Sequence, residues 1–548
     1  MKRIRDYGVI IGEGKTGRLN KITDVPGVKV GHYTVSSDNH KTGITVIMPS
    51  DDNIYLNKMV AASSVINGYG KTMGLMQINE LGSIETPIFL TNTLNSGKIY
   101  DGVVSYMIDT CKKDGVNVTS CNPIVGECND YPLNDISERI LEGDDVRKAI
   151  LDAKVDFEEG SIGAGAGMSC LGMKGGVGSA SRLTLIDGKF YTIGILVVSN
   201  FGGSRDMIFN GKYIGDVIDS KVTNLPSSKG SIMMILATDL PVNERQLKRM
   251  LNRTSVGLAR VGSYIGHDSG DVAIGFTTAN RLGDKTCGHF RTCQVVLEEK
   301  LSYVFKMVAE MTEEAVLNSL ATAFTTTGFN GKTKYSFTDV YLNNYFKGKN
   351  YKAYIDGVKS ICQFPSYPVG CELVTLYMLL KYYGVSVTID DIVSKLKKGP
   401  KPYLEDGVLY GADPEIEFVG DPRDVYSYGV YEGPIIDVAN YFKPGIINAS
   451  GSSLDEVLKL VSLGYPVMVW TSIRLKEPFI SKSWICKENG EKIDWKANLH
   501  VVIVIGYSDN VVTVCDCDTY SITDYDRNKF EEVYNYFGKR VLYYKEKI

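Results

Sequence analysis

A polar stretch near the middle of the chain separates two regions of different sequence texture. It covers residues 324–350, reads FTTTGFNGKTKYSFTDVYLNNYFKGKN, and is rich in Thr, Asn, Gly and Lys, as connections between domains are. The chain has 548 residues, and domains usually hold about 100–200, so several domains are expected. We therefore predict one domain over residues 1–332, a linker over 333–355 and a second domain over 356–548.

The composition excludes several classes of protein. Hydrophobic residues make up 44% and charged residues 23% of the chain, the balance of ordinary globular proteins, and the net charge is −4. Because no Lys/Arg block is present, neither nucleic acid nor a membrane is an expected partner. The basic start is interrupted by Asp6 and Glu13, so it does not read as a signal peptide, and we expect a cytoplasmic protein. The 11 cysteines form no C-x-x-C pair, and no metal or cofactor is expected.

The pattern of apolar residues predicts mixed α and β structure in both regions. In the first region, strand-like runs at 43–48, 192–198, 231–237 and 271–276 alternate with helical patterns at 135–154, 247–261 and 302–320. This alternation predicts a layered α/β domain. In the second region, we expect a helix after Cys371, another at 453–463, and strands at 467–471, 499–505 and 511–515.

Ser231 is the first candidate nucleophile. In SSKGSIMMILATDLP, Gly230 and Ser231 follow a polar loop and open an apolar strand. A Ser at a new N-terminus carries its own general base, since an α-amine titrates at about pH 8. Gly230 would tolerate the strained backbone that self-cleavage needs. The dipeptide alone favours an ordinary strand start.

The motifs around Ser231 resemble those of the P1 family of self-processing aminopeptidases, over about residues 3–332. They are, in chain order, RIRDYGVIIGEGKTG, ITDVPGVKVGHYT, TPIFLTNTLNSG, VGECNDYPLND, GAGAGMSCLGMKGGVGSASR, ILVVSNFGG, GSIMMILATDLP and GLARVGSYIGHDSGDVAIGFTTANR. The resemblance implies an αββα sandwich that cuts itself between Gly230 and Ser231. It also implies a peptide substrate, including peptides of D- or β-amino acids, and a tetramer of cleaved pairs.

The same resemblance implies roles for individual residues. Ser231 would attack the substrate carbonyl, and Asn200 in SNFGG would donate to the oxyanion. Ser269 and Asp271 in DSGD would relay a proton and hold the substrate's ammonium group. Some relatives carry Tyr where this chain has Asn129. Two readings stay open there: Asn129 donates to the oxyanion instead, or the role is vacant.

Cys371 is the second candidate nucleophile. Gly370 precedes it, and an apolar helix is expected to start at Cys371, where unpaired amides favour a thiolate. His500 is the single histidine after residue 350, and Asp516 follows the next predicted strand. Cys, His and Asp in this order, with Gln363 upstream, form the papain-like arrangement.

The second region, over about residues 356–545, resembles the C39-like cysteine peptidases. The resemblance is carried by QFPSYPVGCE, FVGDPRDVYSYGVY, GYPVMVW and LHVVIVIGY. It implies an α+β papain-like fold with Cys371 as nucleophile, His500 as base, Asp516 as its orienting group and Gln363 as oxyanion donor. Asp518 is an alternative orienting group, because Cys517-Asp518 stands where relatives often have Pro.

The leading hypothesis is therefore a two-headed peptide hydrolase, a serine aminopeptidase joined to a cysteine peptidase. In a second hypothesis, the C39-like domain is a non-catalytic binding module. In a third, the first domain transfers acyl groups, because its fold class is shared with ornithine acetyltransferases, which use a Thr nucleophile.

Overall fold

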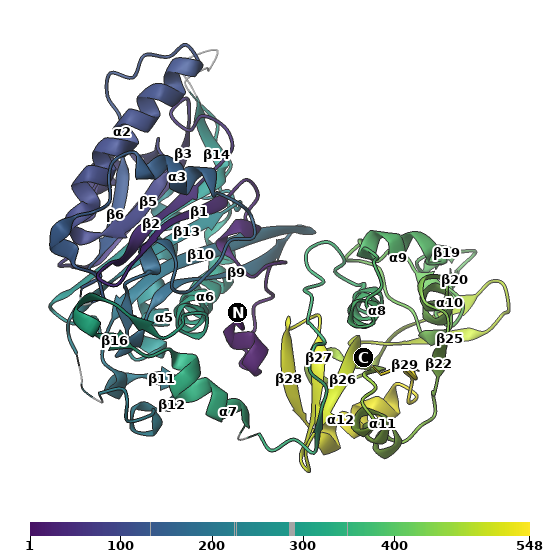
Figure 1. Ribbon diagram of the computed structural model, residues 1–548. Helices are drawn as coiled ribbons and strands as arrows, with labels where there is room; N and C mark the ends of the chain where they lie inside the picture. Colours follow the sequence, from purple (N-terminus) through teal and green to yellow (C-terminus); the bar gives the residue numbers. More distant parts are fainter. Residues whose placement is uncertain (132, 224, 226, 284–290, 348, 548) are drawn as a thin grey trace. The chain divides into compact units, whose positions relative to one another are not determined.

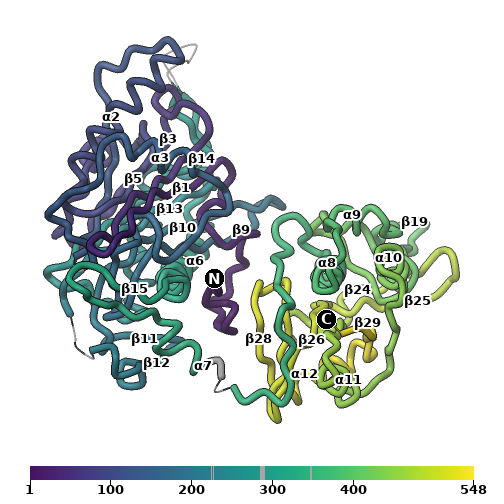
Figure 2. Tube along the Cα trace, viewed as in Figure 1, coloured from purple at the N-terminus to yellow at the C-terminus, as the bar shows by residue number. Residues whose placement is uncertain are grey.

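The described chain forms two compact units. The computed structural model describes all residues except 132, 224, 226, 284–290, 348 and 548. The N-terminal unit holds Met1–Ile4 and Ile11–Phe346, and the C-terminal unit holds Arg5–Ile10 and Lys347–Ile548 (Figures 1 and 2). Part of the expected linker thus lies in the N-terminal unit, where it carries β16 (Thr333–Lys334) and the π-helix η10 (Thr338–Leu342).

Two β-sheets stack in the N-terminal unit. The first sheet contains, in spatial order, β1 (Lys29–Ser36), β2 (Lys41–Met48), β5 (Ile88–Asn92) and β6 (Ile124–Cys128). The second contains β4 (Ser83–Ile84), β3 (Asn57–Gly68), β14 (Ser269–Gly283), β13 (Gly230–Thr238), β10 (Lys189–Phe201) and β9 (Gly176–Ile186). Their apolar inner faces share one buried core, which includes Val46, Val198 and Ile235.

Helices cover the outer faces of both sheets (Figure 1). The first sheet packs against α2 (Ser96–Lys113) and α3 (Asp145–Leu151). The second packs against α4 (Glu244–Leu251) and α6 (Leu301–Ala321), and α5 (Thr254–Arg260) packs against α6. This arrangement confirms the αββα sandwich expected from the sequence.

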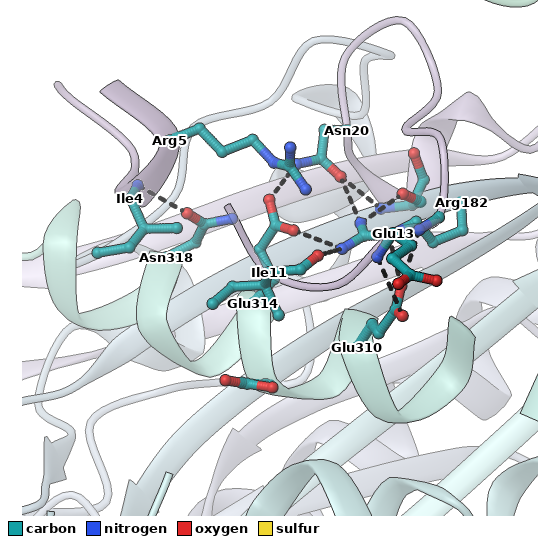
Figure 3. A network of polar contacts seen from close by, with 12 residues as sticks. Ile4, Arg5, Ile11, Glu13, Asn20, Arg182, Glu310, Glu314 and Asn318 are labelled. Carbon is teal, nitrogen blue, oxygen red and sulfur yellow. Dashed lines mark hydrogen bonds and ion pairs between the residues drawn. The ribbon is translucent and has the colours of Figure 1, made fainter. Parts of the chain in front are cut away.

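A buried ion network fastens the N-terminal segment to the second sheet (Figure 3). Arg182 on β9 is fully buried, and its Nη2 lies 2.7 Å from Glu314 Oε2 on α6. Its Nε lies 3.6 Å from Glu310, whose carboxylate also accepts the Gly14 backbone N–H. Asn20 donates its side-chain amide to Glu314. Buried charges need such partners, so this network fixes residues 11–20 against α6 and β9.

Two helix predictions need correction. Over 135–154, only Ile136–Glu138 and α3 are helical, because Arg139 is left-handed at φ 48° and Gly143 packs tightly on Gly102 of α2. Over 247–261, the helix breaks into α4 and α5. The Thr254 hydroxyl donates to the Leu251 carbonyl at 2.7 Å, competing with the backbone amide that a continuous helix would use.

The C-terminal unit is built on a mixed α/β plan. Its main sheet contains β22 (Ile446–Asn448), β29 (Val541–Tyr544), β23 (Val467–Ser472), β26 (Leu499–Tyr507), β27 (Val511–Asp516) and β28 (Ser521–Asp526), and β17 (Ala353–Tyr354) also pairs with β26. Its larger helices are α8 (Cys371–Tyr382), α10 (Glu432–Phe442), α11 (Leu454–Ser462) and α12 (Arg527–Tyr536). Among the helices of the described residues, none is both long and apolar enough to span a membrane.

Candidate active sites

Ser231 lies at the start of a central strand, as the sequence predicts. It is the second residue of β13 and is only 5% exposed. Gly230 before it has φ 149°, a backbone angle that strongly favours glycine. A Cβ at Gly230 would lie 2.5 Å from the Asn200 carbonyl oxygen. The backbone before the nucleophile therefore has a conformation and surroundings that only glycine fits.

Asn200 lies directly beside Ser231. Antiparallel pairing of β10 with β13 sets the two residues opposite each other. The Asn200 Nδ2 donates to Ser231 Oγ at 3.4 Å and to the Asn129 carbonyl at 2.8 Å. The Ser169 backbone N–H donates to Asn200 Oδ1 at 2.9 Å, which fixes the orientation of the amide. An amide held this way can donate to an oxyanion that forms next to Ser231.

Ser269 and Asp271 form a second pair on β14. The Ser269 hydroxyl donates to Asp271 Oδ1 at 2.8 Å, while the buried Oδ2 has no hydrogen-bond partner among the described residues. Burial raises the pKa of Asp271 to about 6, although the Ser269 hydrogen bond acts to lower it. No hydrogen bond of the described residues joins this pair to the Ser231 side chain. In the parallel register, Ser269 lies opposite Gly230 and Gly270 lies opposite Ser231.

A cavity of about 860 Å³ opens beside Ser231. Asn200, Asn129 and Gly230 also line it, as does Glu127, which sequence analysis did not single out. Glu127 is buried on β6, and its carboxylate accepts from the Lys71 backbone N–H at 2.7 Å and from the Thr93 hydroxyl. The sequence signal for Glu127 was its place, in the motif ECND, as an acidic residue inside an otherwise apolar strand.

Asn129 contributes its backbone rather than its side-chain oxygen to the Ser231 site. Its carbonyl accepts from Asn200, and its Oδ1 accepts the Tyr131 backbone N–H at 3.1 Å. Tyr131 also lines the cavity, and its ring is 52% exposed.

Cys371 begins α8, as expected, but its surroundings oppose a thiolate. The side chain is 6% exposed, and its Sγ donates to Glu372 Oε2 at 3.4 Å. Burial, followed by the Glu372 charge, raises the pKa of Cys371 well above its usual value. Burial also raises the pKa of Glu372 to about 7. The helix N-terminus therefore does not lower the pKa of the thiol as the sequence led us to expect.

His500 and Asp516 form a buried pair at neighbouring strand ends. His500 is the second residue of β26 and Asp516 the last of β27, and these antiparallel strands bring Nε2 and Oδ1 to 2.8 Å. Although burial acts to lower it, the Asp516 charge raises the pKa of His500. The alternative partner, Asp518, lies 3.4 Å from Arg474 Nε instead. The described residues show no hydrogen bond between His500 and Cys371.

Gln363 lies next to the start of α8, with its side chain already engaged. Its Nε2 donates to the Pro368 carbonyl at 3.0 Å, and its Oε1 accepts from the Cys517 thiol at 3.1 Å. Cys517, His500 and Asp516 are the one potential metal-binding group in the described part of the chain, with ligand atoms within 4.8 Å of one another. All three side chains already bind protein partners, so the geometry gives no separate reason for a metal.

Comparisons with known proteins agree with this geometry. The model of "Peptidase family S58" matches residues 20–334, which is more than half of the chain. The chain belongs to peptidase family S58. Residues 355–542 match the "Peptidase_C39 like family".

Three relatives of the S58 region illustrate the likeness. The "Beta-peptidyl aminopeptidase BapA" of Sphingosinicella microcystinivorans is 34% identical over 60% of this chain and 88% of its own length. The structure of the PH0078 protein of Pyrococcus horikoshii OT3 is 42% identical, covering 63% of this chain and 98% of that one, with a TM-score of 0.59. The L-aminopeptidase D-Ala-esterase/amidase of Ochrobactrum anthropi, described as a prototype for the serine aminopeptidases and a variant of the Ntn hydrolase fold, is 32% identical over 61% of this chain and 95% of that one, with a TM-score of 0.58.

The two units therefore have distinct family origins. The N-terminal unit is a serine aminopeptidase unit with an Ntn-hydrolase-like fold, and the C-terminal unit contains a C39-like peptidase domain. Both family resemblances seen in the sequence are confirmed. The likeness of the first region to aminopeptidases favours hydrolysis over acyl transfer.

Proposed function

We propose that the N-terminal unit cuts its own chain between Gly230 and Ser231 and then releases amino-terminal residues from peptides. The observation that carries this proposal is a Gly230 whose backbone conformation and surroundings only glycine fits, next to a Ser231 hydroxyl that Asn200 holds. In the first step, Ser231 Oγ attacks the Gly230 carbonyl carbon, the Gly230–Ser231 C–N bond breaks, and the hydroxyl proton passes to the Ser231 nitrogen. Water then hydrolyses the resulting ester, leaving a Gly230 carboxylate and a free Ser231 hydroxyl and amine.

The same residues then act on a peptide. The free α-amine takes the Ser231 hydroxyl proton while Oγ attacks the first carbonyl of the substrate, and Asn200 donates to the oxyanion. The leaving amine takes the proton, and water releases the acyl group. Because Ser269 lies opposite Gly230 in the sheet register, departure of Gly230 would leave the Ser269–Asp271 pair facing the new α-amine. The carboxyl group of Asp271 would then control the protonation state of that amine.

Glu127 is our proposed anchor for the substrate's ammonium group. It is a buried carboxylate on the cavity wall, and both of its oxygens already accept hydrogen bonds, which fix its position. An ammonium–carboxylate contact would select peptides with a free amino end. The name of the Sphingosinicella relative supports trying β-aminoacyl as well as α-aminoacyl peptides, of either hand.

Intact masses and N-terminal sequences of the purified protein test the proposal. We expect a fragment that begins Ser-Ile-Met-Met in the wild type and none in Ser231→Ala, which should also lose aminopeptidase activity. Ser255→Ala is the matched control, because that hydroxyl donates to the Asn252 carbonyl away from the cavity. An uncut wild-type chain that still releases amino-terminal residues would contradict the mechanism.

For the C-terminal unit, we propose a cysteine peptidase that uses Cys371, His500 and Asp516, with Gln363 beside the oxyanion. The buried His500–Asp516 pair supports it. The alternative, a non-catalytic binding module, is favoured by the buried Cys371 with its raised pKa. Peptide cleavage that survives Ser231→Ala but is lost in Ser231→Ala/Cys371→Ala would support the peptidase. No such residual cleavage with any peptide of a random library would support the binding module.

Location and assembly are further proposals. All ten described cysteines are free, which suits a reducing compartment, and we propose the cytoplasm.

By the resemblance given above, the cleaved pairs would form tetramers. Light scattering of the cleaved protein measures its mass, and a monomer would contradict this assembly.

A further inference from the structure

The cavity beside Ser231 carries an excess of positive charge. Lys71, Lys221, Lys229 and Lys334 line it, against the two carboxylates of Glu127 and Asp268. None of the four ammonium groups lies within ion-pair distance of a carboxylate among the described residues. Lysines on protein surfaces commonly find an acidic neighbour, so unpaired lysines gathered around one cavity are available to an anion.

Lys334 is the most firmly placed of these lysines. It is half-buried on β16, where it pairs with Thr326 of β15 (Thr326–Thr327), and its Nζ donates to the Gly172 carbonyl at 3.4 Å. Burial lowers the pKa of Lys334, and the described structure provides no carboxylate to offset this. An anion bound at its Nζ would offset the cost of burying the charge.

The support of Lys334 connects it to the reacting centre. Gly172 is the turn of the hairpin between β7 (Ser169–Cys170) and β8 (Met173–Lys174). Ser169 of this hairpin donates to Asn200, which in turn holds Ser231. Glu127, by contrast, is held by Lys71 and Thr93 from other wall segments. The ammonium anchor and Lys334 are therefore held by different segments of the cavity lining.

Lys221 lines the same cavity as Lys334. Its Nζ lies 5.9 Å from the ring centre of Tyr335, the residue that follows Lys334, and Tyr335 lines the cavity as well. Two ammonium groups that line one cavity can both contribute to binding a carboxylate there.

We propose that Lys334 and Lys221 form a carboxylate-binding subsite for the leaving residue, so that the enzyme prefers short peptides whose second residue carries a carboxylate. The inference rests on the proposed aminopeptidase function. Glu127 takes the amino end and Ser231 the first carbonyl, so a group bound beyond that carbonyl belongs to the leaving residue. A dipeptide spans at most about 7 Å, which this cavity of about 860 Å³ easily accommodates. The carboxylate is either the C-terminus of a dipeptide or an acidic side chain.

Four matched substrates separate these two sources: alanyl-alanine, alanyl-alanine amide, alanyl-glutamate α-amide and alanyl-glutamine α-amide. In the cleaved wild type, we expect kcat/KM to be about tenfold higher for the member of a pair that bears the carboxylate. In Lys334→Gln/Lys221→Gln, this preference should fall below about twofold, because kcat/KM falls for the two substrates that bear the carboxylate. Lys212→Gln, an exposed lysine outside the cavity lining, should keep the wild-type preference. A wild type that cleaves all four equally overturns the inference.

A neutral substrate and a binding measurement separate this inference from the function on which it rests. If alanyl p-nitroanilide is cleaved but no carboxylate preference exists, the aminopeptidase stands and the subsite is wrong. If nothing is cleaved, calorimetry with the uncut Ser231→Ala protein still tests the subsite. There, alanyl-alanine should bind about tenfold more tightly than its amide, and the double Gln variant should abolish the difference. Equal binding overturns the subsite.

Discussion

The two candidate nucleophiles differ in how far their surroundings favour nucleophilic attack. Ser231 opens onto a cavity with an amide already beside its hydroxyl, and only glycine fits the backbone just before it. Cys371 is buried against Glu372, which opposes ionisation of the thiol. In the mechanisms that we propose, the N-terminal unit is thus activated by cleavage of one peptide bond, whereas the thiol of the C-terminal unit is protonated at rest.

This difference has a physical origin. A serine needs no low pKa if a base is created next to it, so cleavage of the chain can activate it once and permanently. A cysteine works as a thiolate, so a nearby carboxylate can keep it inactive until that carboxylate is moved or protonated. The comparison makes opposite predictions for the two units.

Removing the glycine before Ser231 should have the largest effect. In Gly230→Ala, a Cβ would lie 2.5 Å from the Asn200 carbonyl oxygen, so we expect cleavage about 100-fold slower or absent, and no aminopeptidase activity. Gly211→Ala is the control, because Gly211 also has a positive φ of 74° but nothing within 4 Å of its added Cβ. Gel electrophoresis over time measures both. Normal cleavage of Gly230→Ala would show that the backbone conformation of Gly230 plays no part.

Removing the Asn200 amide should have the next largest effect. For cleaved Asn200→Ala, we expect kcat to fall about 10²–10³-fold with a much smaller change in KM, because the amide serves the transition state. The exposed Asn252→Ala should be unaffected. A change confined to KM would mean that Asn200 binds substrate rather than the oxyanion.

The sequence predicts those features that depend on neighbouring residues. The change from polar loop to apolar strand at Gly230–Ser231, and the helix after Cys371, are local patterns, and β13 and α8 begin there. The approach of Asn200 to Ser231 comes from the register of β10 against β13, which spacing along the chain does not encode. Only the family resemblance could supply it.

The burial of individual side chains is the property that the sequence does not reveal. Glu372 directly follows Cys371, yet its effect on the thiol depends on tertiary packing, which removes water from both side chains. Likewise, the lysines of the cavity come from segments far apart in the chain and gather only in the fold. These electrostatic effects therefore could not be predicted from the sequence alone.

Asp271 should produce a smaller, pH-dependent effect in the N-terminal unit. Its pKa of about 6 lies above the unfolded value of about 4, so burial of this carboxyl costs stability progressively as the pH rises from about 4 to about 6. We expect Asp271→Asn to raise the melting temperature at pH 8 and to raise it less at pH 5. Activity should change in the opposite sense: from pH 7 to pH 5, wild-type kcat/KM should fall about tenfold more than that of the variant, whose remaining acid limb belongs to the Ser231 α-amine. Equal acid limbs in the two proteins would assign the whole limb to groups other than Asp271.

The smallest expected effect is on the reactivity of Cys371. It tests directly whether a carboxylate suppresses the nucleophile of the C-terminal unit. With its pKa of about 7, Glu372 is mostly neutral at pH 6 and mostly charged at pH 8. Glu372→Gln should therefore lower the pKa of Cys371 and speed its alkylation by iodoacetamide about three- to tenfold at pH 8, with little change at pH 6. Peptide mass mapping follows Cys371 against the exposed Cys293, whose rate should not change, and the partly exposed Glu405→Gln is the matched variant. If Glu372→Gln labels no faster at pH 8, the carboxylate does not suppress the thiol, and burial alone separates Cys371 from Ser231.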